Sequence, residues 1–411
     1  MKVCMLTTSF PRFEGDYAGV FVYNLSRCLS KRGVGVEVIS PHDYGSKYSE
    51  VRDNIRIHRF PYFYPTKYQR LCYGAGILEN LSRDILAVIQ LPFFVIAEIL
   101  YSLCIIKKEG FDVIHAHWSL PQGLVGLWCK RIFKIPCVTT IHGSDIFGLK
   151  SPWVRALNTK VIKYSDVCTA NSKATARVAC ETYGRKNIEI IPVGVDDTFF
   201  FKKTPNVDAI KRELGIDGRV VLFIGRLIDL KGVDYLIKAT PEVLKRCPDI
   251  NVLLVGSGPQ KEYLMNLSKD LGVENRVVFI DKVAQDEILK FYAIASVFVL
   301  PSIVNARGET EGLGVVLLEA MASGVPVIGS NVGGIPDIIT DGETGLLATQ
   351  KDHDDLADKI IKLLTDEELR KNVTENALRP VKTNLSWEVI ADRFVRIYKD
   401  LIGRNKQEGI F

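Results

Sequence analysis

The feature that most constrains the fold is a regular alternation of short apolar segments, rich in β-branched residues, with helical patterns. Strands are expected at residues 3–8, 36–40, 55–60, 112–117, 136–142, 166–171, 188–194, 220–226, 250–256, 276–280, 296–301, 325–330 and 345–348. Nearly continuous apolar strands separated by helices are typical of parallel sheets covered on both faces. The sequence therefore predicts an α/β fold of the doubly wound type.

These strands are too many for one such sheet, and 411 residues suggest two or three domains. Residues 195–206 (VDDTFFFKKTPN) carry no strand or long-helix pattern, which favours a linker there and two sheets of about six strands each. We expect Rossmann-like domains at 1–197 and 198–385, facing each other across a cleft. Apolar residues at helical spacing predict a terminal helix at 386–402, and segment 386–411 is expected to return to the first domain.

Charge and cysteine content narrow the class of protein. The formal net charge is only +5 and is spread out, which argues against nucleic acid as a partner. The nine cysteines form no CxxC pair, and no signal-peptide pattern follows Met1. We expect a protein of a reducing compartment, cytoplasmic in location.

Two motifs contain candidate ligand-binding residues. In the first, residues 301–347, Gly312-Leu313-Gly314 is expected to open a helix with Glu311 at its start and Glu319 two turns in, on nearly the same face. Free N–H groups at a helix N-terminus bind anions, and acids nearby can accept hydrogen bonds from sugar hydroxyls. The alternative is that the acids only complement the helix dipole.

The second motif, residues 225–232 (GRLIDLKG), comes directly after the apolar strand residues 220–224. Arg226 and Lys231 on one strand-to-helix loop can converge on a diphosphate, the arginine as a planar fork and the lysine as a point charge. The flanking glycines would let a ligand approach closely. The alternative is a pair of solvated loop cations.

Together with Gly256-Ser257-Gly258-Pro259, Pro301-Ser302 and Gly324-x-Pro326-Val327, these motifs resemble family 4 of the retaining glycosyltransferases, in particular bacterial and archaeal members that assemble glycans or glycolipids. The resemblance covers nearly the whole chain and is most specific from Gly225 to Leu347. It implies the GT-B fold and transfer of a hexose-type sugar from a nucleotide-diphosphate sugar, with no metal or other cofactor.

The resemblance also implies roles for residues of the second domain. Arg226 and Lys231 would hold the diphosphate, and Glu319 would bind the ribose. Glu311, with the backbone of Gly312, Leu313 and Gly314, would bind the transferred sugar and the phosphate. Val283 would meet the nucleobase.

In the first domain, His142 in Thr140-Ile141-His142-Gly143 matches the family's histidine near the donor sugar. His142 and Glu311 are therefore the catalytic candidates. His115 and His117 alternate with Ala116 on a core strand and are interpreted as structural. After the first strand, where relatives carry a Gly-Gly pair near the phosphates, this chain has a longer loop. Gly15 is the expected donor-binding substitute, Gly19 is a second candidate, and the loop is expected to touch the acceptor.

Asp352-His353-Asp354 has the D-x-D form of a metal motif, but it precedes an amphipathic helix and is interpreted as an N-cap. We predict no metal site.

Residues 85–106 are long and apolar enough to span a bilayer. Spanning is disfavoured because Pro92 fits the start of a second helix and because the segment lies between strands of one sheet. The two remaining alternatives are a core helix and an interfacial surface flanked by basic residues, namely Lys67, Arg70, Arg83, Lys107 and Lys108.

The sequence thus predicts a retaining glycosyltransferase acting on a glycan or lipid-linked acceptor by a metal-independent front-face mechanism, peripherally attached to the inner face of the membrane if the surface alternative holds. A GT-B phosphorylase or synthase and a non-catalytic nucleotide-sugar-binding protein are the other functions considered.

Overall fold

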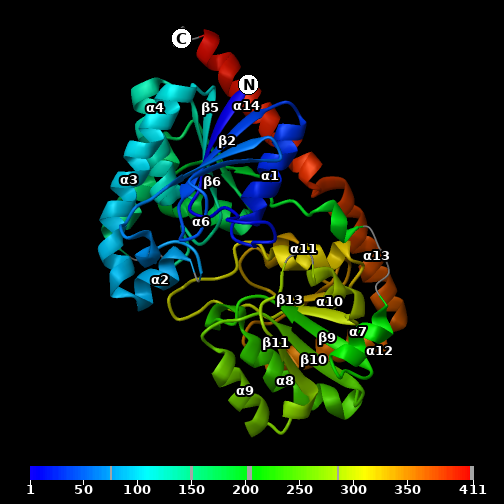
Figure 1. Ribbon diagram of the computed structural model, residues 1–411. Coiled ribbons are helices and arrows are strands. Elements are labelled where there is room, and N and C mark those ends of the chain that lie inside the picture. The colour runs from blue at the N-terminus through cyan, green and yellow to red at the C-terminus, as the bar shows by residue number, and fades with distance from the viewer. Residues whose placement is uncertain (75, 149–150, 201–205, 285–286, 408–411) are drawn as a thin grey trace. The chain divides into compact units, whose positions relative to one another are not determined.

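The computed structural model describes residues 1–74, 76–148, 151–200, 206–284 and 287–407 (Figure 1). The chain divides into two compact units. The first comprises Met1–Gly194 together with the C-terminal segment from Trp387, and the second comprises Val195–Ser386. Of the linker predicted at 195–206, residues 201–205 lie outside the described residues, and Asp197–Phe199 forms a short 3-10 helix.

In the described part of the first unit, one sheet has the strand order β3-β4-β2-β1-β5-β6-β7-β8. Its strands are β1 (Lys2–Leu6), β2 (Gly35–Pro41), β3 (Ser49–Arg52), β4 (Ile55–Phe60), β5 (Val113–His117), β6 (Cys137–Ile141), β7 (Val167–Ala170) and β8 (Glu189–Ile190). Its helices are α1 (Val20–Lys31), α2 (Ile77–Arg83), α3 (Ile85–Glu109), α4 (Leu124–Phe133), α5 (Pro152–Tyr164), α6 (Lys173–Tyr183) and α14 (Trp387–Gln407).

All neighbouring strands in this sheet are parallel except β3, which pairs antiparallel with β4. Strand β3 was not predicted. Its sequence, Ser-Glu-Val-Arg, is short and largely polar, and it lies at the sheet edge, where strands are kept short and charged.

The second unit contains a parallel sheet in the order β11-β10-β9-β12-β13-β14 among its described residues. Its strands are β9 (Arg219–Ile224), β10 (Ile250–Val255), β11 (Val277–Ile280), β12 (Val297–Leu300), β13 (Val327–Ser330) and β14 (Leu346–Ala348). Its helices are α7 (Val207–Glu213), α8 (Val233–Arg246), α9 (Lys261–Asp270), α10 (Ile288–Ile294), α11 (Val315–Ala322), α12 (His353–Thr365) and α13 (Glu367–Asn384). Both units therefore have the predicted doubly wound α/β architecture.

The terminal helix α14 belongs to the first unit. The Tyr398 hydroxyl lies 2.7 Å from Nδ1 of His115 on β5, and an Arg32 nitrogen donates to the carbonyl of Glu388 at 2.6 Å. The segment after Ser386 thus packs on α1 and β5, which precede it by more than two hundred residues in the chain.

Helix α3 differs from its prediction in one respect. It runs unbroken from Ile85 to Glu109 with Pro92 inside it, whereas the proline was expected to begin a second helix. Pro92 and Val88 are both exposed, so the carbonyl of Val88, which loses its helical partner, lies on the side of the helix that water can reach. By length and composition alone, α3 could cross a membrane.

Candidate active site

The topology of the second unit places two long loops together at the carboxyl edge of its sheet. Strand β9 has β10 on one side and β12 on the other, so the strand order reverses direction at β9. Ligands of open α/β sheets bind at such a switch point. The loop after β9 carries Arg226 and Lys231, and the loop after β12 leads to Glu311.

These loops meet through one ion pair. Nζ of Lys231 lies 2.5 Å from Oε2 of Glu311, and the two side chains are only 14% and 15% exposed. The Ser302 hydroxyl donates to the same carboxylate oxygen at 3.2 Å. Burial alone would raise the pKa of Glu311, but the charge of Lys231, the two hydrogen bonds and the charge of Arg226 together hold that pKa below its usual value. The site therefore pairs an ionised carboxylate with a cation.

Gly232 lies where the loop after β9 approaches the loop after β12 closely. Its φ is +61°, and a Cβ atom there would lie 2.1 Å from the carbonyl oxygen of Pro301. The N–H of Ile303 donates to the carbonyl of Leu230 at 2.9 Å, which joins the two loops beside it. The sequence suggested that this glycine lets a ligand approach, whereas the structure uses it to pack the loop after β9 against the loop after β12.

Helix α11 begins later than predicted. Its first residue is Val315 and Gly314 is its N-cap, so Glu311 lies in the preceding loop and Glu319 alone is helical. The prediction that the two acids share a helix face is therefore wrong, because the carbonyl of Glu311 accepts the N–H of Gly334 and holds residue 311 outside the helix. Within the described part of the chain, the N–H groups of Gly312, Leu313 and Gly314 make no hydrogen bond to another backbone group. These amides can donate hydrogen bonds to an anion.

Glu319 lies one turn into α11. The Tyr292 hydroxyl donates to its Oε2 at 2.9 Å. Burial raises the pKa of Glu319 to about 7, although the hydrogen bond from Tyr292 acts in the opposite direction. Near neutral pH this carboxyl is partly ionised, and its ionised form can accept hydrogen bonds from a pair of hydroxyls.

The two other predicted donor-binding residues of this unit lie on the loops after β9 and β11. Arg226 has an exposed side chain on the loop after β9, and its charge acts on Glu311. Val283 is half-buried in the loop after β11, which is the edge strand two positions from β9.

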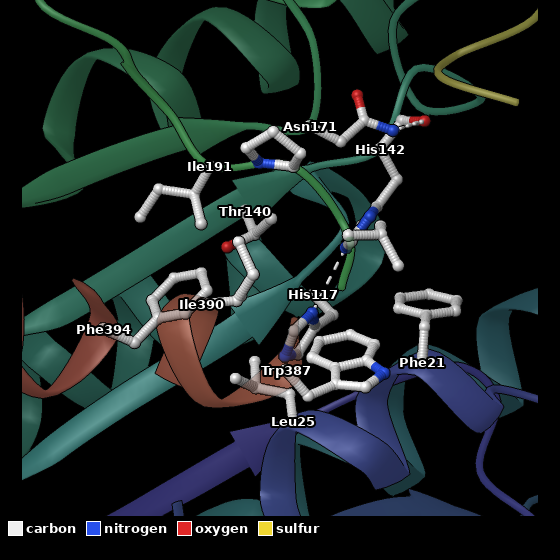
Figure 2. Close-up of a pocket in the computed structure, with 12 residues that line it drawn as sticks. Phe21, Leu25, His117, Thr140, His142, Asn171, Ile191, Trp387, Ile390 and Phe394 are labelled. Carbon is white, nitrogen blue, oxygen red and sulfur yellow. Dashed lines mark hydrogen bonds between the residues drawn. The ribbon is translucent and has the colours of Figure 1, made fainter. Parts of the chain in front are cut away.

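In the first unit, His142 directly follows β6 and lines a small pocket with His117, Thr140, Asn171 and residues of α1 and α14 (Figure 2). An Asn171 side-chain nitrogen donates to the backbone carbonyl of His142 at 3.1 Å. The ring of Phe21 lies 4.9 Å from the imidazole, centroid to centroid. Burial lowers the pKa of His142 to about 3, so the ring is neutral at physiological pH.

His117 is closer to this site than the sequence suggested. Its Nδ1 lies 3.2 Å from Nε2 of His142, and the two rings stack with centroids 5.4 Å apart. His117 Nε2 is buried and has no hydrogen-bond partner in the described part of the chain. Both rings are held neutral by burial, so one of the two facing nitrogens donates and the other accepts, which couples the tautomer of His142 to that of His117. His115, by contrast, is fully engaged by Tyr398 and Thr140, in keeping with a structural role.

Asp145 is a site residue that the sequence reasoning missed. Its carboxylate accepts the N–H groups of His142 and Gly143 at 3.0 Å and that of Ser119 at 2.7 Å. It therefore holds the loops after β5 and β6 in one conformation. The signal was an aspartate three residues after a strand-end histidine, because an aspartate side chain can accept hydrogen bonds from neighbouring backbone N–H groups.

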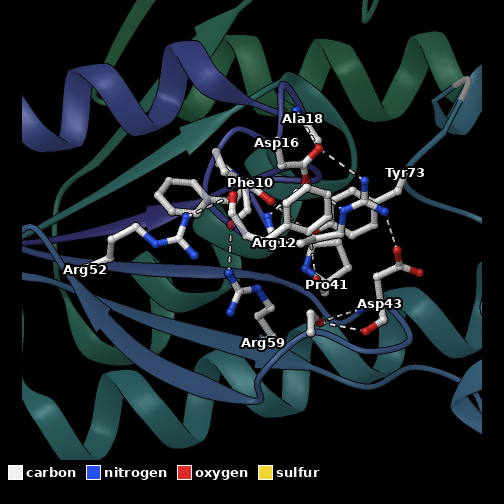
Figure 3. A network of polar contacts seen from close by, with 12 residues as sticks. Phe10, Arg12, Asp16, Ala18, Pro41, Asp43, Arg52, Arg59 and Tyr73 are labelled. Atoms are coloured by element: carbon white, nitrogen blue, oxygen red, sulfur yellow. Dashed lines mark hydrogen bonds and ion pairs between the residues drawn. The ribbon is translucent and has the colours of Figure 1, made fainter. Parts of the chain in front are cut away.

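In the loop after β1, Gly19 rather than Gly15 meets the N-terminus of helix α1. Gly19 is the N-cap, and a Cβ atom there would lie 2.0 Å from the carbonyl oxygen of Ser9. Gly15 has a φ of +80° in an exposed turn, and a Cβ atom there would have no other atom within 4 Å among the described residues. The loop is braced by Arg12, which pairs with Asp16 at 2.7 Å and Asp43 at 2.5 Å (Figure 3).

Asp352 caps helix α12, as expected. Its Oδ1 accepts the N–H groups of Asp354 and Asp355 at 3.1 and 3.0 Å. Asp352, His353 and Asp354 also form the cluster of potential metal ligands found among the described residues, but the oxygen that caps the helix is already engaged.

Comparison with known proteins identifies the class that this fold and these motifs define. Residues 18–199 match Glycosyltransferase Family 4 and residues 206–379 match Glycosyl transferases group 1. The chain is 33% identical to N-acetyl-alpha-D-glucosaminyl L-malate synthase of Bacillus anthracis over 100% of both chains. It is 30% identical to D-inositol 3-phosphate glycosyltransferase of Corynebacterium glutamicum over 100% of this chain and 99% of that one.

Among solved structures, sucrose-phosphate synthase of Thermosynechococcus elongatus superposes with a TM-score of 0.79 at 24% identity, covering 98% of this chain and 99% of that one. The protein belongs to glycosyltransferase family 4, with the GT-B fold, and is a transferase enzyme. The predicted family, fold and enzyme class are confirmed.

Proposed function

We propose that the protein transfers a hexose-type sugar from a nucleotide-diphosphate sugar to a glycan or lipid-linked acceptor, with retention of anomeric configuration and without a metal ion. The proposal rests on one observation. Lys231, Glu311 and the amides of residues 312–314 lie together at the point where the strand order of the second sheet reverses. A cation, a carboxylate and free N–H groups in one place suit a sugar diphosphate, whose phosphates need positive partners and whose hydroxyls need acceptors.

In this proposal Lys231 and Arg226 bind the diphosphate, and the amides of Gly312, Leu313 and Gly314 take up charge that develops on it. Glu311 accepts hydrogen bonds from the transferred sugar, and Glu319 accepts them from the ribose. Val283 lies against the nucleobase. Preorganised donors of this kind stabilise the leaving diphosphate without further reorganisation.

The chemical step is a front-face displacement. The bond between the anomeric carbon and the diphosphate oxygen breaks, and the acceptor oxygen bonds to the same face of that carbon. The acceptor proton passes to a phosphate oxygen of the leaving group. Neutral His142 hydrogen-bonds the donor sugar and orients it, and His117 holds the His142 ring. The loop after β1, with Gly15 and Gly19, contributes to binding the phosphates and the acceptor.

The decisive experiment is incubation of the protein with UDP-, GDP- and ADP-sugars while nucleoside diphosphate release is followed. Slow hydrolysis or transfer of one donor, with the product anomer determined by NMR, supports the proposal. Inversion would refute retention, and release that depends on added inorganic phosphate would indicate a phosphorylase.

Nine free cysteines, most of them buried, fit a reducing compartment, and we propose a cytoplasmic location on that ground. A cytoplasmic location would be contradicted if cell fractionation finds the protein on the outer side of the membrane.

A further inference from the structure

The outward face of helix α3 is apolar along its length. Ile85, Ile89, Phe93, Ile96 and Leu100 recur every three or four residues, and their exposed fractions are 71%, 49%, 51%, 56% and 59%. Such spacing places them on one stripe of the helix. Water-exposed helices of soluble proteins carry polar side chains on this side, so the stripe requires an explanation.

The polar residues in the middle of the same helix are buried instead. Gln90, Glu98 and Ser102 are each 0% exposed. Gln90 accepts the N–H of Arg70 at 2.9 Å, and Gln122 donates to Glu98 at 3.1 Å. A helix that is polar toward protein and apolar outward has the polarity found where the outer medium is lipid.

Helix α4 extends the apolar face. Trp128 and Ile132 lie one turn apart on α4 and are 50% and 55% exposed. Buried residues of α3 and α4, including Phe94 and Cys129, belong to the same core cluster, so both helices cover the same side of the sheet and their outer faces point away from it. Figure 1 shows the two helices along one side of the first unit.

Basic side chains lie at both ends of the stripe. Lys67, Arg70 and Arg83 precede α3, and Lys107 and Lys108 form its last turn, all of them exposed. The acids nearby are fewer, namely Glu79, Asp84 and Glu109. Glu109 is 15% exposed and also pairs with Lys2 and Arg56 inside the unit. Arg70 pairs with Asp84 at 3.6 Å, Arg83 with Glu79 at 2.5 Å and Lys108 with Glu109 at 3.6 Å, so the five basic side chains exceed the three acids by two charges. This remaining positive charge beside apolar side chains is complementary to an anionic bilayer surface.

We propose that α3 and the outer face of α4 form the surface on which the protein lies on an anionic lipid bilayer, with α3 in the plane of the interface. Spanning is incompatible with the fold, because the inner face of α3 packs on the sheet through side chains such as Ala87 and Phe94 that are 0% exposed. Insertion of the helix across the membrane would remove these buried side chains from the core of the first unit. The proposal concerns binding alone and does not depend on the reaction proposed above.

The test is flotation of the full-length protein with vesicles of phosphatidylcholine containing about 30% phosphatidylglycerol, and with pure phosphatidylcholine. The test variant is Ile89→Ser/Ile96→Ser. The matched control is Met265→Ser/Leu271→Ser, which removes two apolar side chains that are 40% and 38% exposed in the second unit. We expect wild type and control to bind the anionic vesicles at low salt, and the test variant to bind at least about tenfold more weakly.

Binding should also weaken as salt rises from about 0.05 to about 0.5 M, because screening shortens the reach of the basic residues. Melting curves accompany each variant, and the test variant should melt within a few degrees of wild type since both replaced side chains are exposed. Phe94→Ser serves as the marker of core damage. Phe93 is 51% exposed whereas its neighbour Phe94 is 0% exposed, so a variant replacing both would combine loss of the surface stripe with damage to the core.

Three results would overturn the proposal. Wild type could fail to bind anionic vesicles at low salt, or the folded test variant could bind as well as wild type. Alternatively, analytical ultracentrifugation could reveal a wild-type dimer that Ile89→Ser/Ile96→Ser dissociates, which would make the stripe an interface between two copies of the chain.

Discussion

Replacement of Lys231 by alanine tests the proposed donor site most directly. In the proposal its ammonium makes one charge-assisted hydrogen bond to the diphosphate, which is worth about 1.5–3 kcal/mol, or roughly 10- to 150-fold in affinity. The same ammonium neutralises Glu311 in the free protein, where both side chains are about 15% exposed. Its removal should therefore also raise the pKa of Glu311 and cost about 1–3 kcal/mol of stability, less than for a fully buried pair because water reaches the site.

The two effects can be separated with a second substitution. Lys231→Ala/Glu311→Gln leaves no uncompensated charge, so its melting temperature should recover toward that of wild type. Its affinity for a nucleoside diphosphate should stay low, because the cation is still missing. The matched control is Lys238→Ala, which breaks the Lys238–Asp234 pair on α8 of the same unit at 2.8 Å.

Isothermal titration calorimetry with UDP, GDP and ADP measures the affinities, and thermal melting measures stability. The assignment of Lys231 to the diphosphate is supported if both Lys231 variants bind weakly while Lys238→Ala binds normally. The double variant should also recover its stability. The reasoning fails if Lys231→Ala binds the diphosphate like wild type, or if affinity returns together with stability in the double variant.

The remaining predictions address other parts of the site. Arg226→Ala should weaken binding of the nucleoside diphosphate by about 10- to 150-fold without unfolding the protein, and unaltered affinity would remove Arg226 from the donor site. The pKa of Glu319 is about 7, and its charged form should bind the ribose better, so the affinity for the nucleoside diphosphate should rise between about pH 6 and pH 8. In Glu319→Gln this affinity should not change with pH. A wild-type affinity that is independent of pH would contradict the prediction. His117→Phe should lower kcat by about 10- to 100-fold through misplacement of His142 while the affinity for free nucleoside diphosphate stays within about twofold, and a normal kcat would show that His117 is structural. Turnover should survive EDTA, since Asp352 of the D-x-D sequence caps a helix; loss of turnover that Mg²⁺ or Mn²⁺ restores would refute the metal-free mechanism.

Much of the fold could be predicted because buried parallel strands are apolar on both faces and therefore visible in the sequence. The predicted segment at 55–60 coincides with β4, and that at 250–256 exceeds β10 by one residue. Strand β3 escaped detection because an edge strand buries little and its residues alternate between exposed and half-buried. The start of α11 was placed too early because an acid and two glycines resemble a helix start. The helix begins at Val315, and the hydrogen bond from Gly334 holds residue 311 outside it.

The sequence by itself determined the class of fold, the family, and the chemical types of the candidate residues, since these depend on local patterns and motifs. Only the tertiary structure decided which of those residues meet. Lys231 and Glu311 are 80 residues apart and come together because β12 lies beside β9 in the sheet, a pairing that no local pattern encodes. His117 reaches His142 for the same reason, through the pairing of β5 with β6. The orientation of α3 likewise came from packing, because a helix that is apolar nearly all round does not show in its sequence which side faces the core.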